Sequence, residues 1–61
     1  MNQISIKERL PEEYVTVYLW GNYENGNGIQ AVGTIVNDEW IFAWKDDPGV
    51  EGKHITHWLE E

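Results

Sequence analysis

The chain has 61 residues, with four Lys or Arg against eleven Asp or Glu, which gives a net charge of −7 at pH 7. This length predicts a single domain over residues 1–61, and the absence of cysteine excludes disulfides, iron–sulfur clusters and thiolate zinc sites. Because no apolar run approaches the roughly 18 residues of a membrane span and the first residues do not read as a secretory signal, we expect a soluble, cytoplasmic protein without membrane contact.

The first predicted element is a short helical turn. Residues 5–8, Ser-Ile-Lys-Glu, match the capping box, in which a hydroxyl is followed three residues later by a carboxylate. Pro11 disfavours helical geometry at the residue before it, so the turn is expected to end near Arg9. We expect Arg9 to form an ion pair with Glu12 or Glu13.

A strand is predicted next, over Val15–Trp20, which is rich in β-branched and aromatic residues. Alternation along it divides the side chains between two faces, with Val15, Val17 and Leu19 on one and Thr16, Tyr18 and Trp20 on the other. Residues 21–28 follow with two Asn-Gly pairs, which are typical of tight turns, so this segment is predicted to be a loop.

Two further strands, over Ile29–Val36 and Glu39–Trp44, are separated only by Asn37-Asp38. This spacing predicts a hairpin with a two-residue primed turn, in which the numbers of opposed residues sum to 75. The apolar face of this hairpin would then pair Ile35 with Trp40, Gly33 with Phe42 and Ala31 with Trp44. The opposite face is predicted to be more mixed and to carry Gln30, Val32, Thr34, Val36, Glu39, Ile41 and Ala43.

The last predicted elements are a loop over Lys45–Lys53, with Asp-Pro-Gly at its centre, and a short strand over His54–Leu59. The fold class is therefore all-β (minor α), a small antiparallel β-meander of three to four strands with a short N-terminal helical turn. A sheet one layer thick needs a cover over its apolar face. The segment around Ile4, Ile6 and Leu10 is one candidate, and a second copy of the protein in a homodimer is another.

The charge and the sparse functional groups disfavour several activities. Phosphate binding needs clustered cations, and the four cations here are scattered, so we expect no direct contact with nucleic acid. His54 and His57 point to opposite sides of a strand, and Asp46-Asp47 lies in an exposed turn, so we expect no metal, no cofactor and no catalytic residues. We therefore expect that the protein is not an enzyme.

Two stretches resemble the DUF551 family of small phage and prophage proteins of unknown function. Residues 4–13, Ile-Ser-Ile-Lys-Glu-Arg-Leu-Pro-Glu-Glu, are similar to the family's N-terminal motif, and residues 55–59, Ile-Thr-His-Trp-Leu, are similar to its C-terminal Thr-His-Trp motif. Gly33-Thr34-Ile35 and Trp40 correspond to the middle of the pattern. The resemblance implies a phage or prophage origin and an accessory role in a bacterial host, and it implies no reaction.

On these grounds we expect the protein to bind a bacterial host protein and thereby to inhibit or modulate a host or defence factor. Trp and Tyr are enriched at the hot spots of protein interfaces, and most carboxylates fall in turns and at chain ends. The candidate partner-binding residues are Tyr18, Trp20, Tyr23, Glu24, Asp46, Asp47, His57 and Trp58. Two alternatives stay open: an acidic mimic of nucleic acid that blocks a DNA- or RNA-binding host protein, and a small-molecule-binding or oligomerisation module.

Overall fold

The Asn37-Asp38 turn joins the two strands of the central hairpin, β3 (Gly28–Val36) and β4 (Glu39–Lys45), in the computed structural model, which describes residues 2–60. Both turn residues have left-handed backbones, with φ of 52° and 63°, as a primed two-residue turn requires. Ile35 lies opposite Trp40 and Gly33 opposite Phe42, so this part of the predicted register is confirmed.

The register of the hairpin changes beyond Gly33, where Val32 lies opposite Trp44 and Ala31 opposite Lys45. The predicted pairing of Ala31 with Trp44 is therefore wrong. One extra residue of β4, between Phe42 and Trp44, forms a β-bulge that shifts all later side chains to the other face. Trp44 consequently leaves the apolar side of the sheet.

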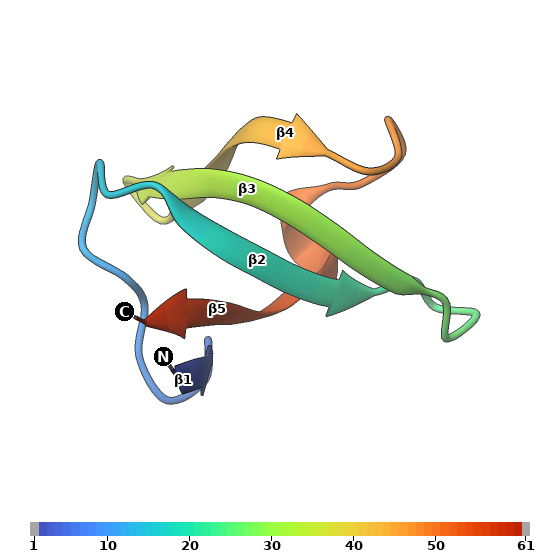
Figure 1. Ribbon diagram of the computed structural model, residues 1–61, viewed down its shortest axis with the longest axis horizontal. Helices are drawn as coiled ribbons and strands as arrows, with labels where there is room; N and C mark the ends of the chain where they lie inside the picture. The colour runs from blue at the N-terminus through green and yellow to red at the C-terminus, as the bar shows by residue number, and fades with distance from the viewer. Residues whose placement is uncertain (1, 61) are drawn as a thin grey trace.

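The whole sheet has five antiparallel strands in the order β1-β5-β2-β3-β4 (Figure 1). β2 (Val17–Asn22) pairs with β3 along its full length, and β5 (Ile55–Glu60) lies between β2 and β1 (Asn2–Ser5). The all-β class is confirmed, with one or two more strands than expected. β2 begins two residues later than predicted, and it includes Gly21 and Asn22, which were placed in the following loop.

The N-terminal segment extends the sheet as edge strand β1 and does not form a separate cover. Ile4 is buried and Ile6 packs partly against the core, but Leu10 is 42% exposed, so its predicted covering role is wrong. After β1 the chain makes the predicted single turn. The backbone N–H groups of Glu8 and Arg9 donate to the Ser5 carbonyl, and the N–H of Lys7 donates to Ser5 Oγ (3.2 Å).

A second bulge determines which side chains of β5 face the core. Leu19 lies opposite Trp58, Trp20 opposite His57 and Gly21 opposite Ile55, which leaves one extra residue in β5. Ile55 and Trp58 therefore both face the core although they are three residues apart, a spacing that a regular strand would not allow.

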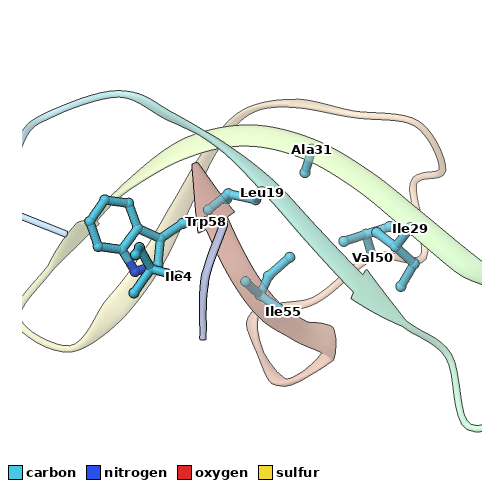
Figure 2. Packing of buried hydrophobic residues seen from close by; sticks show 7 residues of the cluster. All are labelled: Ile4, Leu19, Ile29, Ala31, Val50, Ile55 and Trp58. Carbon is cyan, nitrogen blue, oxygen red and sulfur yellow. The ribbon is translucent and has the colours of Figure 1, made fainter. Parts of the chain in front are cut away.

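The connection from β4 to β5 covers the inner face of the sheet. It contains the short 3₁₀ helix η1 (Gly52–His54), and its Val50 side chain is only 2% exposed. Figure 2 shows Val50 beside Ile29, with Trp58 beside Ile4 at the other end of the row. The core cluster contains Ile4, Leu19, Ile29, Ala31, Val50, Ile55 and Trp58. Within residues 2–60, no helix is long and apolar enough to span a membrane.

Candidate functional site

The outer face of the sheet carries a row of exposed apolar and aromatic side chains. Register places Tyr18 opposite Val32 and Val32 opposite Trp44, so the three side chains lie side by side across β2, β3 and β4. Tyr18 is 59% exposed and Trp44 53% exposed. Ile41, which lies opposite Thr34 in the neighbouring row, is 54% exposed. We call the surface formed by Tyr18, Val32, Ile41 and Trp44 the open face.

The open face exists because of the bulge in β4. Without the extra residue, Trp44 would lie on the core side of the sheet, opposite Ala31. Large side chains that are more than half exposed have no other described part of the chain packed over them. Three such side chains, Tyr18, Ile41 and Trp44, lie around the partly exposed Val32 and form with it a contiguous apolar patch, which is typical of an interaction surface.

Trp20 and His57 lie beside the open face, opposite each other on β2 and β5. Both side chains are half-buried. The hydroxyl of Thr56 lies 2.9 Å from His57 Nδ1 and donates to the Trp20 carbonyl (3.4 Å). The structure therefore brings together three of the predicted partner-binding residues, Tyr18, Trp20 and His57, on the same side of the sheet.

Trp58 has a different place from the other predicted partner-binding residues. It is 5% exposed and belongs to the core. Its indole N–H donates to the Arg9 carbonyl (2.9 Å), and the Arg9 guanidinium lies 5.2 Å from the centre of the indole ring. The Arg9 side chain also forms an ion pair with Glu60. The predicted partner, Glu12 or Glu13, is thus wrong, because the fold brings the C-terminal end of β5 beside the turn.

The remaining predicted residues gather at the other end of the molecule. Tyr23 packs partly against the core, with its ring 4.9 Å from that of His54 in an edge-to-face arrangement. Burial of the Tyr23 hydroxyl is the main cause that raises the pKa of Tyr23 above 10.0. The nearby carboxylates of Asp47 and Asp46 also raise this pKa, Asp47 more than Asp46. Glu24 is exposed in the turn that follows Tyr23. None of these residues belongs to the open face, although Asp46, two residues after Trp44, borders it.

A groove opens between β2 and β5 next to the open face. It has a volume of about 630 Å³, and we call it the β2–β5 groove. Tyr18 and Val32 belong to both surfaces. The groove is lined by Arg9, Pro11, Glu12, Val15, Thr16, Val17, Tyr18, Val32, Trp58, Leu59 and Glu60. Sequence reasoning missed this groove, because its lining comes from segments that are about 45 residues apart in the chain.

The charges around these surfaces are mostly negative. Glu39 lies on the outer side of the sheet opposite Val36, and Asp46 Oδ2 accepts a hydrogen bond from the Gln30 N–H (3.1 Å). Lys45 points to the core side, where its Nζ lies 5.5 Å from the Phe42 ring centre and donates to the Val50 carbonyl (3.3 Å). The described residues hold no group of three or more His, Asp or Glu side chains that could bind a metal ion.

The fold and these surfaces define a small all-β protein with one covered sheet face, one exposed apolar face and a side groove. Residues 4–60 match the family described as "Protein of unknown function (DUF551)", and the chain therefore belongs to this family. No curated protein and no solved structure matches the chain. The motifs around Arg9 and Trp58, which suggested the resemblance, meet in the lining of the β2–β5 groove.

Proposed function

We propose that this protein is a non-enzymatic accessory protein of a phage or prophage, which acts in the bacterial cytoplasm by binding a host protein through the open face. The observation that carries this proposal is the row of Tyr18, Val32 and Trp44 across three neighbouring strands, in which both aromatic side chains are more than half exposed. Aromatic side chains in such a position provide the buried centre of an interface once a partner covers them.

The available area fits this role. A standard interface covers about 800 Å² on each partner, which is about a fifth of the 4306 Å² of accessible surface of this chain. One face of the sheet can supply that area. The partner that suits the surface is a protein with an apolar patch surrounded by basic residues, because the net charge here is −7 and Lys45 points away from the open face.

A mimic of nucleic acid is the less favoured function. The described carboxylates are divided among the segment before β2, the β2–β3 turn, the β3–β4 turn, the start of β4, the β4–η1 connection and β5. A mimic needs them in a row with the spacing of phosphates. Glu61, one of the carboxylates at the chain ends, lies outside the described residues.

Capture from bacterial lysate, compared between matched variants, tests the proposal. The wild-type protein should retain a partner in a fixed ratio, the Tyr18→Ser/Trp44→Ser variant should lose it, and Glu24→Gln should keep it. Retention of the same protein by the open-face variant would overturn the proposal. Release of the partner by added DNA in competition would favour the mimic instead.

A further inference from the structure

We propose that the β2–β5 groove binds an extended, basic segment of a protein partner, by strand addition and by contact of one of its cations with Glu12. The inference rests on the proposed function in that the segment belongs to the host protein that covers the open face. The groove shares Tyr18 and Val32 with the open face, but Glu12 belongs to the groove alone and Trp44 to the open face alone. The two proposals can therefore be tested separately.

The groove exists because β2 and β5 separate at one end. Their pairing ends at Leu19 and Trp58, but β2 continues back to Val17 and β5 continues on to Glu60. Figure 1 shows the two strands diverging toward the end of the sheet, where the segment between β1 and β2 passes alongside. The facing edges of β2 and β5 are therefore not paired with each other in this region.

Each of these two stretches is paired on one side only. Val17 and Tyr18 pair with β3, and Leu59 and Glu60 pair with β1. Their other edges face the groove. Unpaired strand edges are a template for an added strand, whose backbone supplies the missing hydrogen bonds while its side chains enter pockets on alternate sides. An extended segment is accordingly the form of ligand that this site accepts.

The volume of the groove suits several residues of such a segment. Ligand sites in proteins typically enclose about 300–1,000 Å³, and the groove, at about 630 Å³, lies within this range. Its walls are partly polar and partly apolar, with Val15, Val17, Val32 and Leu59 among the apolar lining residues. These walls accept aliphatic side chains or the aliphatic stems of lysine and arginine.

The charges select a basic segment. Glu12 and Glu60 both line the groove, and the one cation of the lining, Arg9, is held by Glu60 and by the Trp58 ring. This arrangement leaves one carboxylate without a matching cation on a protein of net charge −7, which disfavours phosphate and acidic peptides. A second copy of this chain is a poor occupant, because it carries the same charge and only four scattered cations.

The test is an NMR titration of the ¹⁵N-labelled full chain with a synthetic peptide of alternating lysine and valine. We expect saturable shifts at the amides of Val17, Tyr18, Leu59 and Glu60, and no binding of the same peptide with glutamate in place of lysine. Glu12→Gln should weaken binding about two- to fivefold, as the loss of one exposed charge pair does. Glu24→Gln, which changes the net charge equally at a distant turn, should have a smaller effect.

Two results would overturn the inference: equal binding of the lysine and glutamate peptides, or shifts confined to Ile41 and Trp44. The Trp44→Ser variant separates it from the proposed function. This variant should lose the captured partner while it keeps the affinity for the lysine peptide. If partner capture depends on Trp44 but the lysine peptide does not bind at millimolar concentration, peptide binding by the groove is refuted. The proposal that the open face binds the host protein would then still be supported.

Discussion

The contact between Arg9 and Trp58 joins the two ends of the described chain, and the Trp58→Phe substitution measures its strength. The smaller ring loses the hydrogen bond of the indole N–H to the Arg9 carbonyl, which is worth about 1 kcal/mol. It also weakens the contact with the guanidinium by about 0.5 kcal/mol and buries less apolar surface by about 1 kcal/mol. The free energy of unfolding should therefore fall by about 2–3 kcal/mol, a large part of the roughly 3–9 kcal/mol expected for a chain of this length.

Thermal unfolding followed by circular dichroism measures this effect, with an expected fall in Tm of roughly 10–20 °C. Trp44→Phe is the matched control, because it makes the same change at a side chain that is 53% exposed. The control should alter stability by less than about 0.5 kcal/mol. Equal losses of Tm in the two variants would refute the reasoning, since they would show that the contact with Arg9 contributes nothing specific.

Two further predictions concern the bulge in β4 and the cluster around Tyr23. In Gly33→Ala the new Cβ would lie 2.3 Å from the Ile41 carbonyl oxygen, so the free energy of unfolding, measured in urea, should fall by about 2 kcal/mol or more. Gly28→Ala is the control, because a Cβ there meets nothing within 4 Å. An equal loss of stability in the two variants would contradict this prediction. Because burial and the Asp47 carboxylate raise the pKa of Tyr23 above 10.0, the folded state holds this proton more tightly, and stability should decrease as the pH rises above 10.0. The decrease should be smaller in Tyr23→Phe, and identical pH profiles of the two proteins would exclude this cause.

The local turn chemistry of the central hairpin was sufficient to predict its register near the turn. Asn37 and Asp38 accept left-handed backbones readily, and a two-residue loop fixes which residues face each other. The pairs from Val36–Glu39 to Gly33–Phe42 follow from this rule. The segments around Leu19 and Trp58 were also correctly predicted to be strands, from their composition.

The positions of the two bulges could not be predicted, because alternation of side chains assumes a regular strand. In β4 the bulge lies where Gly33 allows the backbone at Ile41 to approach closely. Its consequence is that Trp44 lies on the open face and not on the core side of the sheet. The β-strand character of Asn2–Ser5 was missed for a similar reason: an edge strand of four mostly polar residues carries a weak sequence signal.

The ion pair of Arg9 shows the limit of reasoning from nearby residues. Glu12 and Glu13 are close in sequence, but Glu60 is the residue that the fold places at the guanidinium. The side chain of Glu13 instead accepts a hydrogen bond from the Asn37 N–H (2.7 Å) at the central turn. The β2–β5 groove depends on such long-range contacts, and only the folded chain reveals it.

Site-specific photo-crosslinking in bacterial cells tests most directly the central claim that the open face binds a host protein. A photoreactive benzoylphenylalanine would replace Trp44 in one variant and Glu24 in the control. We predict one predominant protein adduct from position 44 and none from position 24. Adducts of equal yield from both positions, or no adduct from position 44, would contradict the claim.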